Sequence, residues 1–284
     1  MNRISTAFIA IISAAALTQI ASAADLPRKA PAYVPPPAPA WTGFYIGGHL
    51  GGAWETNGSG SASDPLVTIT FAPISRDFNA SAFLAGGQIG YNYQFSPNWL
   101  VGVEADGSWT RLHASTTAAP VFFPNGTPFS ATSVQFGSNV DWLVSLRARL
   151  GYVWGNNWMA YVTGGAAWAR FKYSANFICP NVDCGALLSG LVAPGSGSST
   201  DVTWVAGVGV QWRPTAQNWS IGAEYLYYGF NTTHNFTGAE LDAGTGAQVS
   251  FGGCGGAVPC NLSYSIKDSN IQVARVRFDW KFGP

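Results

Sequence analysis

Residues of alternating character run through long stretches of this sequence, and this period of two constrains the fold more than any other feature. From Asp141 to Trp154 every second residue is apolar, and those between are mostly polar or charged. A β-strand puts two such rows on opposite faces, whereas a helix would mix them. A stretch at 158–173 alternates less cleanly, since Gly164 and Gly165 are typical of a β-bulge and leave its register open. Clear alternation recurs at 83–95, 99–110, 204–212, 219–227 and 274–282.

The composition excludes several other classes of protein. Hydrophobic residues make up 47% of the 284 residues and charged residues 10%, and 14 Lys and Arg balance 14 Asp and Glu. A chain so poor in cations lacks the basic surface of a nucleic-acid-binding protein. Its 12 Trp and 17 Phe exclude intrinsic disorder. Beyond the amino-terminal residues no run of about 18 apolar residues occurs, so membrane-spanning helices are not expected.

A repeat of roughly sixty residues organises the alternating stretches. The dipeptide Asn-Trp occurs at 98–99, 157–158 and 218–219, each time after residues typical of a turn, and Trp41 marks one earlier unit. Each of the four units is expected to hold two strands and one long connection, with short turns between units. The four units therefore predict eight strands. The long connections are expected near 55–77, 113–137, 174–200 and 231–268.

The positions of the tryptophans indicate which face of the strands meets lipid. Trp99 and Trp109 bracket one apolar row, and Trp158 and Trp168 bracket another. Ten residues of a strand tilted near 40° rise about 25 Å, which is the height of the apolar band of an outer-membrane barrel. We therefore expect apolar rows to face lipid and charged rows to face the interior. The predicted membrane-interface aromatics are Trp99, Trp109, Trp142, Trp154, Trp158, Trp168, Trp204, Trp212, Trp219 and Trp280.

The predicted fold is an all-β, eight-stranded antiparallel up-and-down transmembrane β-barrel with short periplasmic turns and long extracellular loops. The amino terminus adds an export signal, because Arg3 precedes an apolar stretch and Ala21-Ser22-Ala23 has the form of a cleavage site. The following segment is rich in proline and is expected to be an extended linker. The predicted organisation is a signal peptide at 1–23, a Pro-rich linker at 24–40 and an outer-membrane β-barrel domain at 41–284.

The opening of the mature chain resembles a known family. Ala24-Asp25-Leu26-Pro27, the Pro-rich spacer and the stretch WTGFYIGG at 41–48 are similar to the small outer-membrane β-barrel (porin-family) proteins of rhizobia and brucellae, which are OmpA-like in fold. The resemblance implies an eight-stranded barrel in the cell outer membrane. It also implies contact with outer-membrane lipid and lipopolysaccharide and with the barrel-assembly machinery. The family usually ends on an aromatic residue, whereas here Gly283-Pro284 follow Phe282.

The inward rows predict an ionic network in the barrel lumen. Eight strands leave an interior just wide enough for side chains, and pairing offsets part of the cost of burying charge. We interpret the network as a plug; a selectivity filter or gate is the alternative. The predicted function is structural, in envelope integrity, with a porin-type channel or a surface haem- or ligand-binding protein as the alternative. The predicted network consists of Glu104, Asp106, Asp141, Arg147, Arg149, Glu224, Arg275, Arg277, Asp279 and Lys281.

The three histidines give little support for catalysis. His49 is expected to form hydrogen bonds in the lumen. His113 and Ser115 resemble the His-x-Ser pair of outer-membrane lipid A deacylases, but no carboxylate beside them is expected to orient the ring. We therefore predict neither an enzyme nor a cofactor, and His113 with His234 remains open as a haem-ligating set.

The four cysteines form two close pairs, each flanked by residues typical of loops. In an exported chain such pairs predict local disulfides, and no metal site is expected because finger-like spacing with histidine or further thiolates is missing. The predicted pairs are Cys179 with Cys184 and Cys254 with Cys260.

Overall fold

The computed structural model covers most of the predicted barrel domain. The predicted signal peptide (1–23) and linker (24–40) lie outside the described residues and remain predictions. Among the described residues, no helix is long and apolar enough to span a membrane. The described residues are 41–63, 74–119, 121–122, 128–129, 132–155, 157–179, 190–215, 217–249 and 261–282.

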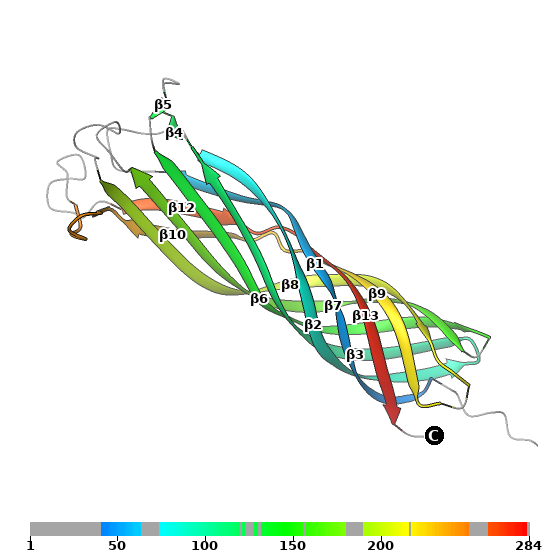
Figure 1. Cartoon of the computed structure of the whole chain (residues 1–284). Helices are drawn as coiled ribbons and strands as arrows, with labels where there is room; N and C mark the ends of the chain where they lie inside the picture. Colours follow the sequence, from blue (N-terminus) through cyan, green and yellow to red (C-terminus); the bar gives the residue numbers. More distant parts are fainter. Residues whose placement is uncertain are drawn as a thin grey trace, which may run out of the picture. The chain divides into compact units, whose positions relative to one another are not determined.

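Eight strands form a closed antiparallel ring, which confirms the predicted fold. β1 pairs with both β2 and β13, so Phe44 lies opposite Tyr91 on one side and Phe282 on the other. Figure 1 shows this closure, with β13 (red) beside β1 (blue). In ring order the strands are β1 (Gly43–Ser63), β2 (Ile74–Ser96), β3 (Trp99–Ala118), β6 (Ser133–Trp154), β7 (Trp158–Cys179), β8 (Leu191–Trp212), β9 (Trp219–Tyr228) and β13 (Ile271–Phe282).

Shorter strands continue the sheet towards the extracellular end. β12 (Asn261–Lys267) pairs with the outer part of β1, and β10 (Thr233–Ala239) pairs with β12. Strand structure is thus interrupted at two places in this part of the wall. One lies between β9 and β10, and the other lies between β12 and β13. The remaining described strands have two residues each: β4 (Val121–Phe122), β5 (Pro128–Phe129) and β11 (Leu241–Asp242).

The strands extend further than the sequence predicts, so the long connections are shorter than expected. The sequence predicts a long connection at 113–137, but β3 continues to Ala118 and β6 begins at Ser133. It also predicts one at 174–200, but β7 continues to Cys179 and β8 begins at Leu191. These extensions carry the barrel wall beyond the apolar band.

The sidedness of the wall reverses along each long strand. On β3 the outward row is apolar up to Trp109, and the inward row at the same height holds Glu104 and Asp106. Beyond Trp109 the outward row becomes polar, and the inward Leu112 is 1% exposed. The lower part therefore has the sidedness of a barrel in lipid, and the upper part has that of a protein in water.

A bulge at Asp141 corrects one predicted side-chain direction. The register of β6 shifts between Val140 and Trp142, and the parity of the strand changes there. Asp141 consequently lies on the outer surface, where it pairs with Lys172 at 2.7 Å, with side chains 39% and 53% exposed respectively. The prediction that Asp141 faces the lumen is wrong, because the extra residue of a bulge reverses the alternation.

The register of β7 is continuous through both of its central glycines. Gly164 lies opposite Ala148 and Gly165 opposite Arg147, without an interruption. A Cβ on Gly165 would lie 2.0 Å from the backbone oxygen of Leu146, whereas one on Gly164 would meet nothing closer than 3.5 Å. Gly165 is thus required by a close approach of neighbouring strands.

Candidate functional site

The centre of the lumen is occupied by Glu104, which contacts three arginines. Its Oε1 lies 2.5 Å from Nη2 of Arg147, and its Oε2 lies 2.7 Å from Arg149 and 2.5 Å from Arg277. Glu104 is on β3 and Arg277 on β13, which are not neighbours in the ring, so this contact crosses the lumen. Charge-assisted hydrogen bonds of this kind are the strongest that side chains form.

A second carboxylate ties together the other side of the ring. Glu224 on β9 accepts from Arg147 on β6 at 2.9 Å and pairs with Arg275 on β13 at 2.7 Å. Arg275 also pairs with Asp106 on β3 at 2.8 Å. These side chains are between 0% and 1% exposed, so the network excludes solvent at this level.

Uncharged side chains outside the predicted set complete the network. Asp279 pairs with Arg277 at 2.8 Å and accepts hydrogen bonds from the amides of Gln88, at 2.7 Å, and Gln211. The sequence does indicate such residues, because polar side chains on the inward row of a membrane strand need hydrogen-bond partners inside the barrel. Others are Tyr45, whose hydroxyl donates to Glu104 at 2.6 Å, and Tyr161, whose ring lies 4.0 Å from the Arg149 guanidinium.

His49 belongs to the same interior, as the sequence predicts. Its Nδ1 lies 2.6 Å from the amide oxygen of Gln88 and its Nε2 lies 2.8 Å from the hydroxyl of Ser108. Arg275 approaches the same Nε2 at 3.2 Å.

Lys281 lies on the inward row of β13, as predicted, but nearer the rim than the other predicted members of the network. It is half-buried near the end of β13, where its Nζ donates to the backbone oxygen of Thr42 at 3.0 Å. Lys281 is the second-last residue of β13 and lies at the periplasmic rim. The ion pairs found among the described residues of the network join four acids to four arginines: Glu104, Asp106, Glu224 and Asp279 with Arg147, Arg149, Arg275 and Arg277.

Buried apolar side chains close the lumen on both sides of the network. The periplasmic cluster consists of Trp41, Leu100, Val153, Met159 and Tyr161. The larger extracellular cluster includes Leu84, Leu112, Leu143, Phe171, Leu226 and Tyr228. The interior is thus a stack of three layers, apolar, ionic and apolar.

The predicted interface tryptophans lie on the outer surface. Trp99 and Trp158 at the periplasmic boundary are 43% exposed, and Trp109 at the extracellular boundary is 73% exposed. Trp154 stacks on Trp158 with ring centroids 6.2 Å apart. The remaining predicted girdle residues Trp142, Trp168, Trp204, Trp212, Trp219 and Trp280 lie on the same outward rows and are half-buried or exposed.

The two remaining histidines lie on opposite sides of the wall. His113 is exposed on the outside of β3, where its ring contacts the side-chain oxygen of Asn139 at 2.5 Å. His234 points inwards from β10. The structure therefore does not bring these two residues together as haem ligands. Ser115 lies two residues from His113 on the same face, and among the described residues no carboxylate bonds to the His113 ring.

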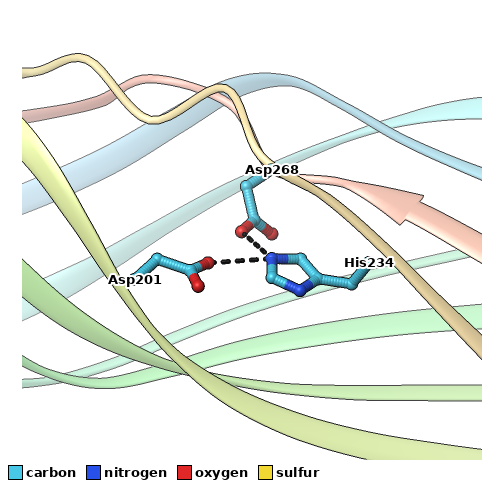
Figure 2. A group of neighbouring side chains, drawn as sticks. All are labelled: Asp201, His234 and Asp268. Atoms are coloured by element: carbon cyan, nitrogen blue, oxygen red, sulfur yellow. Dashed lines mark hydrogen bonds and ion pairs between the residues drawn. The ribbon is translucent and has the colours of Figure 1, made fainter.

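His234 instead meets two aspartates in the interior, in the part of the wall just above the apolar band (Figure 2). Asp201 Oδ2 lies 2.8 Å and Asp268 Oδ2 lies 3.1 Å from the same Nε2 atom. Burial raises the pKa of Asp268 to about 9. No local sequence pattern indicates this cluster, because the three residues are far apart in the chain and only the tertiary structure joins them.

The predicted disulfides fall largely outside the described residues. Cys179 ends β7 and is not a free thiol. Cys184, Cys254 and Cys260 lie outside the described residues, so the pairing remains a prediction.

A closed antiparallel ring with an outward apolar band, tryptophan girdles and a charged interior defines a transmembrane β-barrel of the outer-membrane class. The family model "Outer membrane protein beta-barrel domain" matches residues 5–253, and the chain belongs to this family. Its location is the cell outer membrane.

A relative named as an outer-membrane protein agrees with this class. The chain is 29% identical to the 31 kDa outer-membrane immunogenic protein of Brucella melitensis over 202 residues, covering 70% of this chain and 75% of the relative. In a comparison with solved structures, the chain aligns with OprG of Pseudomonas aeruginosa at 12% identity and a TM-score of 0.39, covering 85% of this chain and 97% of OprG. The outer membrane protease OmpT of Escherichia coli has 10% identity and a TM-score of 0.43, covering 84% of this chain and 97% of OmpT.

Proposed function

We propose that this protein is a structural component of the outer membrane, acting in envelope integrity, with a lumen that is closed to solutes. The observation that carries the proposal is the ionic layer, in which charged side chains from β3, β6, β9 and β13 meet across the lumen and exclude solvent. Such contacts lock strands that are not neighbours in the ring. We further propose that the outward band contacts outer-membrane lipid and lipopolysaccharide, and that the barrel-assembly machinery inserts the chain.

The same layer favours a plug over the alternative of a porin-type channel. A selectivity filter requires charges that water and solutes can reach. Here Glu104 and Arg147 are 1% and 0% exposed, and both neighbouring layers are apolar. Opening a path would therefore leave buried charges without partners, at a cost of several kcal/mol for each, about 3–5 kcal/mol.

Neither a haem site nor an enzyme is favoured by the geometry. Haem ligation by His113 together with His234 would require two residues that lie on opposite faces of the wall. The deacylase-like pair His113 and Ser115 lies on the exposed outer face, with Asn139 beside the ring in place of a carboxylate. We therefore propose a non-enzymatic role.

Planar bilayer recordings test the closed lumen. The purified protein, folded as judged by its shift in gel mobility on boiling, should insert without producing stable conductance steps. A large, stable single-channel conductance from this folded form would contradict the plug.

The envelope role is tested in cells of the source bacterium. A deletion strain should become sensitive to detergents and large antibiotics, and expression of the non-conducting protein should restore resistance. Unchanged sensitivity of the deletion strain would refute the structural role. Deacylase activity on lipid A that is lost in Ser115→Ala would refute the non-enzymatic proposal.

A further inference from the structure

Three ligand-type side chains converge where two strands of the extracellular barrel wall are interrupted. Asp201 belongs to β8, His234 to β10, and Asp268 to the segment between β12 and β13. The two interruptions lie side by side, since the backbone N–H of Asp268 donates to Thr232 at 2.9 Å. Within the described residues, no ladder pairing joins β10 to β8. The cluster thus lies at a seam of the wall.

The geometry of the cluster is that of a ligand set. One oxygen of each aspartate is directed at the same imidazole Nε2, at 2.8 Å and 3.1 Å (Figure 2). An imidazole nitrogen carries at most one proton, so it cannot donate a well-directed hydrogen bond to both carboxylates at once. The three ligand atoms all lie within 4.8 Å of one another. A small movement would place each of them about 2.0–2.2 Å from one central ion.

One oxygen of each carboxylate has no hydrogen bond. Asp268 is 2% exposed, and its Oδ1 has no hydrogen-bond partner. The Oδ2 of Asp201, although close to Nε2, also lacks a hydrogen bond. A buried, unpaired carboxylate oxygen is costly. Both oxygens are therefore available to coordinate a cation.

The local charge is unbalanced, in contrast to the ionic network below it. The network matches each of its acids with an arginine. Around Asp201 and Asp268, no lysine or arginine of the described chain forms an ion pair, and Glu55 adds a third buried carboxylate nearby. A divalent ion bound between Asp201 and Asp268 would supply the positive charge that no described lysine or arginine provides there.

Neighbouring side chains hold the ligands in place, as is usual around metal sites. Ser199 donates from its hydroxyl to Asp201 Oδ1 at 2.7 Å, and Tyr173 donates to Asp268 Oδ2 at 3.1 Å. The Tyr173 ring also stacks on His234 with centroids 4.4 Å apart. The side chains of His234 and Asp201 keep 15% and 11% exposure, so an ion can reach the site from solvent.

We propose that Asp201, His234 and Asp268 bind one divalent transition-metal ion, which ties the interrupted strands to β8. One imidazole nitrogen with carboxylate oxygens suits ions such as Zn²⁺, Mn²⁺ or Co²⁺ better than Ca²⁺ or Mg²⁺, which prefer oxygen ligands alone. The free Oδ1 of Asp268 can provide an additional bond. The site is independent of the proposed plug, which lies in a different layer.

Metal titration of the untagged protein, extracted in detergent and stripped with a chelator, tests this site. Equilibrium dialysis with Zn²⁺ should give one ion per chain, and Co²⁺ should produce a visible ligand-field spectrum. Asp201→Asn and His234→Gln should each weaken Zn²⁺ binding by at least about tenfold. His113→Gln, which removes the exposed histidine, is the matched control and should bind as the parent does.

The outcomes separate the metal site from a purely structural triad. Ser199→Ala keeps all three ligands and should still weaken Zn²⁺ binding by about ten- to a hundredfold, so the test survives if His234→Gln fails to fold. Folding of each variant is checked by its gel-mobility shift on boiling. The proposal is overturned if the parent binds no stoichiometric Zn²⁺, or if the folded variants of the site bind as tightly as His113→Gln.

Discussion

Replacing Glu104 by glutamine is the most informative perturbation of the ionic layer. The side chain keeps its size but loses the charge that three arginines share, at 2.5–2.7 Å. Arg147 retains Glu224 and Asp106, and Arg277 retains Asp279. Arg149 retains no carboxylate among the described ion pairs, and keeps only Gln211 at 3.2 Å and the faces of two tyrosines.

The expected cost follows from that uncompensated guanidinium. Breaking a buried ion pair by removing one partner costs about 3–5 kcal/mol. At 1.4 kcal/mol for each factor of ten, the folding equilibrium should shift by roughly a hundredfold to a few thousandfold. Asp141→Asn, in the exposed pair with Lys172, should cost no more than about 1 kcal/mol and serves as the control.

The assay is urea unfolding of the barrel in lipid vesicles, followed by the band of the folded form on unboiled gels. The double variant Glu104→Gln/Arg149→Gln removes both members of the pair that depends most on Glu104. It should be less destabilised than the sum of the single variants, with a coupling free energy of about 0.5–3 kcal/mol. Equal effects of Glu104→Gln and Asp141→Asn, or strict additivity in the double variant, would refute the reasoning.

Three further predictions use the same unfolding measurement. Val103→Arg puts a charge on the outward row, where Val103 is 57% exposed, and should destabilise the barrel by about 2–4 kcal/mol. Ser115→Arg, in the polar extension of the same strand, should be near neutral. Equal costs for the two variants would contradict the placement of the apolar band. Gly165→Ala should destabilise the barrel by about 1–3 kcal/mol, because its Cβ would lie 2.0 Å from the backbone oxygen of Leu146. Gly164→Ala is the control and should not destabilise it. Equal stability of the two variants would argue against the close approach of the strands at Gly165. Burial raises the pKa of Glu55 from 4.5 to about 7, so its contribution to stability is complete below pH 4.5 and is lost as the pH rises through 7. Between pH 4.5 and 7 the free energy of unfolding of Glu55→Gln should therefore fall less than that of the parent. Parallel pH profiles of the two proteins would disprove this prediction.

The sequence alone determined the part of the barrel that lies in lipid. Between Trp99 and Trp109, or between Trp142 and Trp154, lipid on one side and a narrow interior on the other force opposite chemistry on the two faces. Strict alternation records this requirement residue by residue, so strand number, sidedness and most members of the ionic layer could be predicted. The spacing of the tryptophans along each strand also predicted the height of the apolar band.

Above the apolar band, alternation of apolar and polar residues no longer predicts the strands. In stretches such as 195–201, the outward face meets water and glycine or small polar residues occupy both rows, so strand and loop look alike in sequence. A single bulge at Asp141 reversed the direction of that side chain, because an alternation rule contains no signal for one inserted residue.

Only the tertiary structure decided which groups meet. The pairing of Glu104 with Arg149 and Arg277 depends on strands that cross the lumen from positions far apart in the ring. The convergence of Asp201, His234 and Asp268 depends on two strand interruptions that lie side by side. A sequence records the face on which each residue lies, but the distance between two faces is set by closure of the barrel and by the register of its strands.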